Sequence, residues 1–590
     1  MTDLNENSSI NPVGVVLGTQ EATPLDFWVA VLPRQVLRLD DVVTVRIQRP
    51  DGQGMIDFYG VVDQVRRSYE GIDFETDSFL ASRGDMPVTE SYAAHVQVTR
   101  IHPEDYLPPA PGANVFLARE KELEIGLFFD EMDQKTPAGK MQNGSPAYLN
   151  FEFIDGNKGA HINISGLSGV ATKTSYALFL LHSIFNSGVL GSRAPNTKAL
   201  IFNVKGEDLF FLDKFNSKQD ETNKAAYELL KLPFEPFKDC NFRASPKRNG
   251  GVPFSNLNQR ADEKIQPYIW SLKEVCRKRL LKFLMSGNDI QKSNLPFLLS
   301  NIEELLSNLA NDKHNKGNSG HLITDRYGES GKTKISNFSE LVEFLEDKLL
   351  GIGRPGEDDE GNPDARWLAR NAPATAMALV RRLRAAGDEV SHLIRGDLED
   401  EQFERYKLAP LAPGHCLTVA DINKLGSIAK MFVVGVTLQE IFQEKEKSGQ
   451  GAPIFIVLDE LNKYAPREGY SPIKDLLVDI AERGRSLGII LIGAQQTASE
   501  VERRVVGQSA IRVVGRLDGA EAQRPEYNFL TGTCRQRAQF MKSGTMFIHQ
   551  PEVPTPLLIN FPFPAYATRS KEVADDPAEE EELAADLDRV

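Results

Sequence analysis

The sequence has few cysteines and no long apolar run, and both absences limit what the protein can be. Its four cysteines lie far apart, without the CxxC spacing of a zinc site, and predict a reducing compartment and no disulfide framework. No stretch of eighteen apolar residues occurs, so the sequence predicts no membrane-spanning helix. The first residues, MTDLNENSSINP, lack the basic and apolar segments of a secretion signal. We therefore expect a cytoplasmic protein without membrane contact.

A surplus of positive charge is also absent. The formal net charge of −15 argues against a protein that coats nucleic acid. The last twenty residues hold nine acids and two bases, so much of this charge is local. Residues 568–590 are expected to form an acidic disordered tail, because they have little apolar surface to bury. The rest of the chain remains compatible with a DNA-binding surface in the form of a confined basic channel.

Length and texture predict several domains. At 590 residues the chain is too long for one hydrophobic core. Residues 1–118 contain short runs of Val, Ile and aromatics between turn residues, which predict a small β-barrel or a β-sandwich. Residues 119–215 and 412–567 alternate strand and helix patterns, as in a parallel sheet covered by helices, and residues 216–411 form a mostly helical insertion between them. The predicted class is α/β, with an N-terminal β-barrel and a helical insertion.

The segment ISGLSGVATKTSYALFLL, residues 164–181, has the layout of a phosphate-binding loop. A short strand enters it and an apolar helix leaves it, so backbone N–H groups of the helix N-terminus would face phosphate. Lys173 is predicted to bridge the β- and γ-phosphates, and Thr174 to hold Mg²⁺. The predicted nucleotide-binding residues are Gly166, Ser168, Gly169, Val170, Ala171, Thr172, Lys173, Thr174 and Ser175.

This loop departs from the usual pattern. Gly166 and Lys173 are seven positions apart rather than six, and Thr172 carries a Cβ where backbone usually approaches phosphate closely. The departure predicts nucleotide binding with slow turnover. A glycine-containing turn that leads into a core helix is the alternative interpretation of the segment.

A second candidate, YGESGKTK at residues 327–334, has the Gly-Lys-Thr that the first one lacks. A phosphate loop needs a buried strand before it and a helix directly after it. This segment follows a largely polar stretch, and the next helix pattern begins only at Asn337 or Ser339. Arg326 also stands where the earlier glycine belongs. The context therefore predicts a solvated turn.

The run APIFIVLDELN, residues 452–462, has the form of a buried strand that ends in two acids. Asp459 at the strand's carboxyl end is predicted to accept from a magnesium-bound water. Glu460 is placed to polarise the attacking water as a general base. The later strand GIILIGAQQ ends at Gln495, a candidate sensor of the γ-phosphate or of that water.

Two arginines lie between the preceding helix and that last strand. Arg483 and Arg485 are candidates for a finger that reaches into a neighbouring subunit's site and stabilises transition-state charge there. Two exposed arginines near a helix C-terminus, where they complement the helix dipole, are an equally good interpretation.

Taken in order, the β-rich start, HINISGLSGVATKTS, IFNVKGED, LTVADINKL, IVLDEL, AERGRSLGIILIGAQQ and AIRVVGRL resemble the HerA branch of the HerA/FtsK ATPases, over about residues 13 to 565. The resemblance implies a RecA-like sheet, a homohexameric ring, and ATP and Mg²⁺ as cofactors. It also implies that the ring hydrolyses ATP at subunit interfaces and translocates or unwinds double-stranded DNA. The N-terminal barrel would dock a nuclease or another effector, and we expect a role in antiviral defence.

Carried over residue by residue, the resemblance implies that Lys173 and Thr174 contact phosphate and Mg²⁺, and that Asp459 and Glu460 are the Walker B acids. It makes Gln495 the sensor. The trans finger would be Arg485, with Arg483 as second choice. The altered loop at residues 170–173 is the clear mismatch. It leaves a second function open, in which a hexameric scaffold binds nucleotide, hydrolyses little of it, and arrays and gates an effector enzyme.

Overall fold

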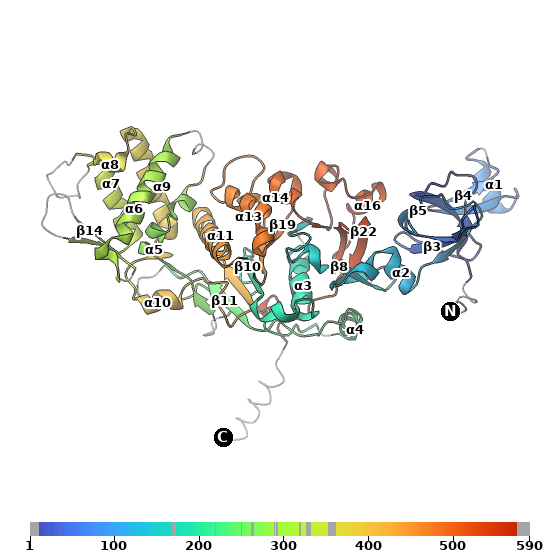
Figure 1. The fold of residues 1–590 in the computed structure, drawn as a ribbon, viewed down its shortest axis with the longest axis horizontal. Helices are drawn as coiled ribbons and strands as arrows, with labels where there is room; N and C mark the ends of the chain where they lie inside the picture. Colours follow the sequence, from blue (N-terminus) through green and yellow to red (C-terminus); the bar gives the residue numbers. More distant parts are fainter. Residues whose placement is uncertain are drawn as a thin grey trace, which may run out of the picture.

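An N-terminal barrel, a central sheet and a helical region follow one another along the long axis of the molecule (Figure 1). No helix in the described part of the chain is long and apolar enough to span a membrane. The computed structural model describes residues 11–72, 74–167, 173–218, 220–248, 251–260, 265–287, 290, 293–317, 320–325, 332–351, 362–449 and 451–574.

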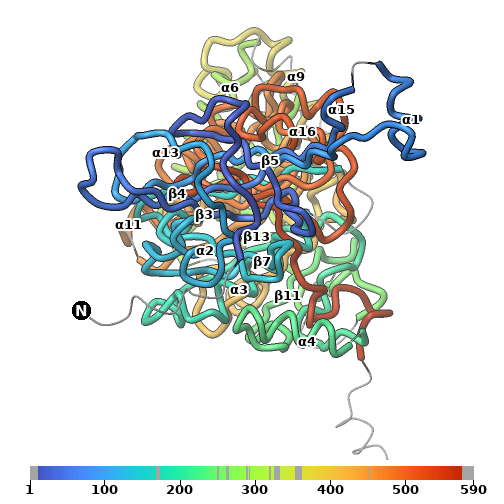
Figure 2. Tube along the Cα trace, turned by 90° about the vertical axis from the view of Figure 1, so that its right-hand side faces the viewer, coloured from blue at the N-terminus to red at the C-terminus, as the bar shows by residue number. Residues whose placement is uncertain are grey.

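The N-terminal region closes into an antiparallel barrel, which is one of the two β architectures that its short apolar runs predict. Its strands, in the order β1-β2-β5-β4-β3-β6 around the barrel, are β1 (Gly14–Val16), β2 (Asp26–Val31), β3 (Val42–Gln48), β4 (Met55–Glu70), β5 (Thr89–His102) and β6 (Asn114–Leu117). Val29, Phe58 and Val96 are buried in its interior. The β4–β5 hairpin extends beyond the barrel and carries α1 (Asp77–Arg83) at its tip (Figure 2).

The central sheet has twelve strands and is parallel from β12 to β20 and antiparallel beyond β20. Its order is β12-β11-β17-β10-β18-β19-β9-β20-β21-β22-β7-β8. The strands are β7 (Lys135–Met141), β8 (Pro146–Asn150), β9 (Ile162–Ser165), β10 (Lys198–Asn203), β11 (Cys240–Ala244), β12 (Ile265–Pro267), β17 (Leu417–Asp421), β18 (Ile454–Asp459), β19 (Ile489–Gln495), β20 (Ile511–Val514), β21 (Thr545–Gln550) and β22 (Val553–Asn560).

The central parallel strands are buried on both faces, which explains their unbroken apolar sequences. In β18, Val457 belongs to the core that contains α3 (Lys173–Asn186) on one face of the sheet. Its neighbour Ile456 belongs to the core that contains α11 (Ser427–Ser448) and α13 (Lys474–Leu487) on the other face. This alternation confirms the predicted parallel sheet covered by helices.

The helical region lies at the end of the molecule opposite the barrel (Figure 1). Its buried apolar residues form one core with those of α11, so it is anchored on that face of the sheet. Its helices and two short ribbons are α5 (Leu272–Arg277), α6 (Leu295–Asn311), α7 (Phe338–Leu350), α8 (Ala365–Leu368), α9 (Pro373–Val390) and α10 (Asp400–Arg405), β13 (Trp270–Ser271) with β16 (Ile394–Arg395), and β14 (Leu322–Asp325) with β15 (Lys332–Ile335). The remaining α-helices are α2 (Lys121–Gly126), α4 (Glu221–Leu229), α12 (Leu461–Tyr464), α14 (Arg503–Gly507), α15 (Gly519–Ala522) and α16 (Gly532–Arg537).

Two segments differ from the sequence-based expectation. Residues 216–411 are not only helical, because they supply β11 and β12 to one edge of the sheet. Residues 568–574 were expected to belong to a disordered tail, and this is wrong for them. Their backbone pairs with the chain after β10: Ala574 N donates to Phe215 O at 2.9 Å, and Glu572 O accepts from Ser217 N at 2.7 Å.

The barrel is fastened to the central sheet domain by polar contacts. Arg537 of α16 forms a bidentate ion pair with Asp40 of the barrel, at 2.8 and 2.6 Å. Both side chains are largely buried, so this pair is screened from salt more than a surface pair. On the other side, Thr99 Oγ1 of β5 donates to Gly126 O of α2 at 2.6 Å.

His161, just before β9, ties the sheet to α13 as a neutral imidazole. Its Nδ1 accepts from Leu491 N at 3.0 Å, so Nε2 carries the proton and donates to Ala481 O at 3.1 Å. Burial lowers the pKa of His161 to about 4. The unfolded chain therefore binds this proton near pH 6.5 and the folded chain only near pH 4, so stability falls as the pH falls through that window.

From pH 7.5 to pH 5.0, His161 is expected to remove about 2 kcal/mol of unfolding free energy. Urea unfolding at the two pH values measures this loss. The His161→Gln variant should lose about 2 kcal/mol less than the wild type over the same change, because its side chain does not titrate. An equal loss in both proteins would contradict the assignment.

Candidate functional site

The topology brings three of the predicted site residues, Lys173, Asp459 and Gln495, to one edge of the sheet. Strands β9, β19, β18 and β10 are parallel neighbours, so their carboxyl ends meet there. The register pairs Asp459 with Ala494, and Gln495 with Ser165. In open parallel sheets this edge is where ligands bind.

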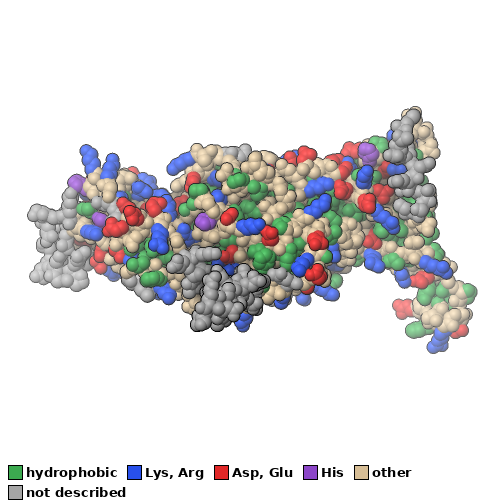
Figure 3. Space-filling view, turned by 90° about the horizontal axis from the view of Figure 1, so that it is seen from below, with side chains coloured by type: hydrophobic (Ala, Val, Ile, Leu, Met, Phe, Trp, Pro, Cys, Tyr) green, Lys and Arg blue, Asp and Glu red, His purple; other side chains and the backbone are tan. Residues whose placement is uncertain are grey.

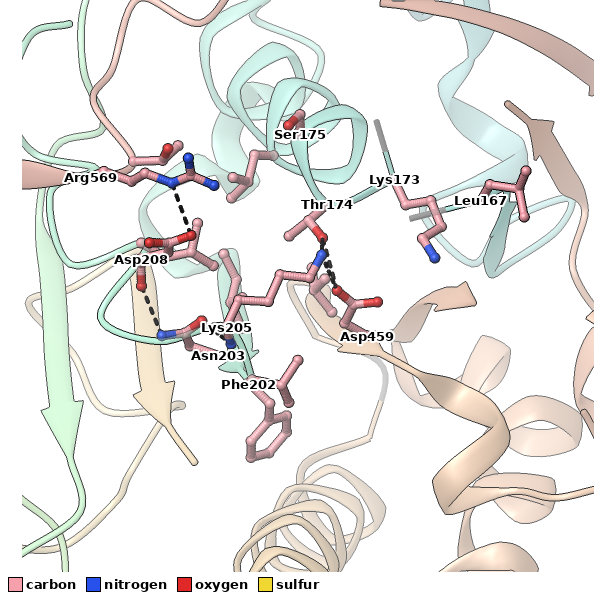
Figure 4. Close-up of a pocket in the computed structure, with 16 residues that line it drawn as sticks. Leu167, Lys173, Thr174, Ser175, Phe202, Asn203, Lys205, Asp208, Asp459 and Arg569 are labelled. Atoms are coloured by element: carbon pink, nitrogen blue, oxygen red, sulfur yellow. Dashed lines mark hydrogen bonds and ion pairs between the residues drawn. The ribbon is translucent and has the colours of Figure 1, made fainter. Parts of the chain in front are cut away.

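A cavity of about 240 Å³ opens at this edge, between the start of α3 and the end of β10 (Figure 4). Polar side chains from four separate segments meet in it, and an apolar floor comes from β10 and β18. It is lined by Leu167, Lys173, Thr174, Ser175, Leu178, Ile201, Phe202, Asn203, Val204, Lys205, Asp208, Leu209, Val457, Asp459, Thr568 and Arg569.

The first turn of α3 faces the cavity. Lys173 is the first residue of the helix and is only 4% exposed. Burial lowers the pKa of its ammonium group, an effect that Asp459 opposes and the nearby Lys205 reinforces. A buried cation at the positive end of a helix dipole is poorly compensated by the protein alone, and a phosphate anion would compensate it.

Thr174 and Asp459, 285 positions apart in the sequence, are in direct contact. The Thr174 hydroxyl donates to Asp459 Oδ2 at 2.9 Å. Lys205 Nζ donates to the same Thr174 oxygen at 2.8 Å and lies 2.8 Å from Asp459 Oδ2 (Figure 4). The Thr174 hydroxyl and the Asp459 carboxylate thus both contact the Lys205 ammonium group. The same two oxygen-bearing groups suit Mg²⁺, which prefers hard oxygen ligands.

Glu460 has an unusual backbone. It lies in the left-handed region, with φ 60° and ψ 45°, and its amide donates to Asp459 Oδ1 at 3.0 Å. For a residue with a Cβ this conformation costs about 1 kcal/mol, and such strain gathers at functional sites. Its carboxylate pairs with Lys463 at 2.5 Å and does not line the cavity.

Gln495 is fully buried at the end of β19. Its amide donates to Asn163 Oδ1 at 2.8 Å and to Ser165 Oγ at 3.1 Å, both on β9. Its backbone oxygen accepts from Gly166 N at 3.2 Å. Gln495 therefore holds the strand that enters the phosphate loop, and its side chain does not line the cavity.

The two candidate arginines lie at the opposite edge of the sheet. Both are in the last turn of α13, just before β19 begins. Arg485 donates to the backbone oxygens of Gly156, at 3.4 Å, and Asn157. Arg483 pairs with Glu446 at 2.5 Å. Neither arginine lines the cavity at the carboxyl edge of the sheet.

Only the two ends of the predicted phosphate loop lie within the described residues. Gly166 sits where β9 and β20 converge, and a Cβ there would come within 3.4 Å of Arg516 O. Ser168, Gly169, Val170, Ala171 and Thr172 lie outside the described residues. In the rival segment, Lys332 begins strand β15 rather than a helix, and β15 pairs only with β14 within the described residues. That context does not fit a phosphate loop.

Several cavity residues were missed by sequence reasoning. Asn203 ends β10, and Lys205 follows it in the run IFNVKGED. A polar residue at the carboxyl end of a buried strand was the available signal, because such ends meet at the ligand-binding edge. Arg569, which forms an ion pair with Asp208 at 3.1 Å, carried no such signal.

Comparisons with known proteins give weak likenesses. No family model and no curated protein matches the sequence. The bacterial conjugative coupling protein TrwBdeltaN70, unbound, is 12% identical with a TM-score of 0.44, over 78% of this chain and 93% of that one. VirB4 of Thermoanaerobacter pseudethanolicus is 13% identical with a TM-score of 0.40, over 76% and 98%. The genome packaging NTPase B204 from Sulfolobus turreted icosahedral virus 2 is 13% identical with a TM-score of 0.20, over 25% and 69%. Likenesses of this size establish neither a shared family nor a shared function.

Proposed function

We propose that the chain is an ATPase that binds ATP and Mg²⁺ at the cavity between α3 and β10. The observation that carries the proposal is the contact between Thr174 Oγ1 and Asp459 Oδ2 at 2.9 Å. It joins the segment predicted to grip phosphate to the segment predicted to hold the metal. Lys173, buried and poorly compensated beside them, supplies the positive charge that a triphosphate needs.

The side chains divide the work of hydrolysis as follows. Thr174 and Asp459 would hold the metal, and bound Mg²⁺ would neutralise charge on the phosphate oxygens. Lys173 orients the terminal phosphates, and Glu460 accepts a proton from the attacking water as the bond to the γ-phosphorus forms. The bond to the bridging oxygen then breaks, giving ADP and phosphate. Glu460 must leave its partner Lys463 to act, since its carboxylate now lies outside the cavity.

The finer proposal is a homohexameric ring that moves or unwinds double-stranded DNA. Its support is the place of Arg483 and Arg485, which lie at the edge of the sheet opposite their own cavity. An arginine there is useful to catalysis only in a neighbouring subunit's site. The barrel projects from the end of the molecule, where a nuclease or other effector could dock, and antiviral defence is the setting we propose (Figure 1).

The DNA contact is expected on a limited surface. On the face shown in Figure 3, basic and acidic side chains are interspersed along the whole molecule. In the helical region, the sequence has two dense basic runs, CRKRLLK (276–282) and RRLR (381–384). Both are partly neutralised, since Lys278 lies 2.6 Å from Glu440 and Arg384 pairs with Glu346. A channel lining exposed only in the ring is the arrangement that remains compatible with DNA binding.

The second candidate function is a nucleotide-binding scaffold that arrays and gates an effector. The pairing of Glu460 with Lys463, away from the cavity, favours it, because a base held elsewhere gives slow hydrolysis. The longer phosphate loop points the same way.

Duplex DNA is expected to raise the ATPase rate of the assembled protein about tenfold or more if the motor function is correct, since DNA would order the neighbouring subunits around each site. The measurement is steady-state phosphate release with and without duplex DNA, at low and high salt, because DNA contacts weaken as salt rises. Bound nucleotide with neither DNA stimulation nor hydrolysis would favour the scaffold. Absence of nucleotide binding by the folded protein would refute both.

A further inference from the structure

Lys205 occupies a position that the proposed chemistry gives to a metal ion. Its ammonium nitrogen is 2.8 Å from Thr174 Oγ1 and 2.8 Å from Asp459 Oδ2. These are the two oxygen atoms assigned above to the metal, and they are 2.9 Å from each other. The three atoms thus form a closed triangle of two hydrogen bonds and one ion pair.

The backbone that carries Lys205 is fixed. Asn203, which is 1% exposed, accepts from Lys205 N with Oδ1 at 3.1 Å. Its Nδ2 donates to Gly206 O at 2.9 Å and to Asp208 O at 2.8 Å. One buried amide therefore shapes the whole turn after β10 and directs the lysine side chain toward Asp459.

The side chain itself borders solvent, which gives it room to swing away from Thr174 and Asp459. That of Lys205 is 48% exposed, whereas that of Asp459 is 5% exposed. Lys173 starts α3 and is 4% exposed, so the helix holds it in place. Of the two lysines in the cavity, Lys205 is the one that can leave by changing rotamer.

A metal ion and this ammonium group cannot share the two oxygens. A divalent ion held by Thr174 and, through water, by Asp459 would lie within a few ångströms of Lys205 Nζ. Like charges at that separation repel strongly in a largely buried site. Entry of one cation therefore requires the departure of the other.

We propose that Lys205 takes the place of the metal cation in the metal-free site. Its ammonium group holds Thr174 and Asp459 when no metal is bound, and Mg²⁺ must displace it. This inference rests on the proposed function, since it takes the cavity to be a nucleotide site. Lys205 lowers the dependence of nucleotide binding on Mg²⁺, because it supplies positive charge to the metal-free site and opposes the metal. It determines how sharply the site distinguishes nucleotide with metal from nucleotide without it.

The test is the affinity for a fluorescent ADP analogue, measured in Mg²⁺ and in EDTA. In Lys205→Met, the ratio of the dissociation constant in EDTA to that in Mg²⁺ is expected to rise about tenfold over the wild-type ratio. Lys205→Arg keeps a cation at the position and should keep a ratio near that of the wild type. Thermal unfolding checks that each variant folds, which we expect for a half-exposed side chain.

Lys424→Met is the matched control. Lys424 follows the neighbouring strand β17, pairs with Glu207 at 3.1 Å, and does not line the cavity. Its removal deletes the same charge nearby and should leave the ratio unchanged. Equal ratios in the wild type and Lys205→Met would overturn the proposal while leaving the nucleotide site intact. Failure of the wild type to bind the analogue in either condition would overturn the proposed function, and this inference with it.

Discussion

Replacing Glu460 by glutamine is expected to lower the rate of ATP hydrolysis by a factor of about 10² to 10⁴, while nucleotide affinity changes little. The amide keeps the size of the side chain and loses the ability to accept a proton from water. Glu460 does not line the cavity in which the nucleotide would sit, so binding does not depend on it. Single-turnover hydrolysis and nucleotide titration of the same variant measure the two effects separately.

The matched control is Glu468→Gln, an exposed acid in the loop after α12. It removes the same charge from the same stretch of chain, and hydrolysis should stay at the wild-type rate. A Glu460→Gln variant that hydrolyses ATP as fast as the wild type would contradict the assignment of Glu460 as the base. Such a result would point to another acid near the carboxyl edge of the sheet as the base.

Replacing Lys173 by methionine is expected to weaken nucleotide binding by about 30- to 150-fold, because one charge-assisted contact to phosphate contributes roughly 2 to 3 kcal/mol. Burial lowers the pKa of Lys173, which means that the folded, empty protein disfavours its charged form. Removal of that charge should therefore leave the nucleotide-free protein at least as stable as the wild type. Nucleotide titration and thermal unfolding give the two results independently.

Lys198→Met provides the comparison for a buried lysine outside the cavity. Lys198 begins β10, at the opposite edge of the sheet, and its ammonium group donates to His415 O at 2.6 Å. Its replacement is expected to lower stability, because that carbonyl loses its partner, and to leave nucleotide affinity unchanged. Similar affinity losses in both variants would mean that Lys173 acts on the fold rather than on phosphate.

The architecture could be predicted from the sequence, and so could the proximity of the segments around Lys173 and Asp459. Strands buried on both faces show continuous apolar runs, and such a run ending at Asp459 predicted a strand with its acid at the sheet edge. A helix that begins at Lys173 after an apolar strand predicted the other half. Because parallel neighbours end at the same edge, these local patterns were sufficient to expect that the segments around Lys173 and Glu460 lie together.

The missed features depend on long-range pairing that leaves little trace in local composition. Lys205 looks like any polar residue in a turn, and only the position of β10 beside β18 turns it toward Asp459. The strands β11 and β12 are short and lie within mostly helical sequence, so no periodicity indicated them. Gln495 stays a predicted sensor of the γ-phosphate or the attacking water; its Nε2 donates to Asn163 and Ser165 on the adjoining strand, a pairing that the local sequence did not indicate.

The segment 568–574 has a practical consequence for anyone who shortens the protein. Thr568 and Arg569 form part of the cavity wall, and Arg569 is tied to Asp208 across it. A version ending at residue 567, chosen to omit the acidic stretch, would lose that wall and the backbone pairing with residues 215–217. Ending instead at residue 574 would remove eight of the nine acids in the last twenty residues and leave the chamber closed on that side.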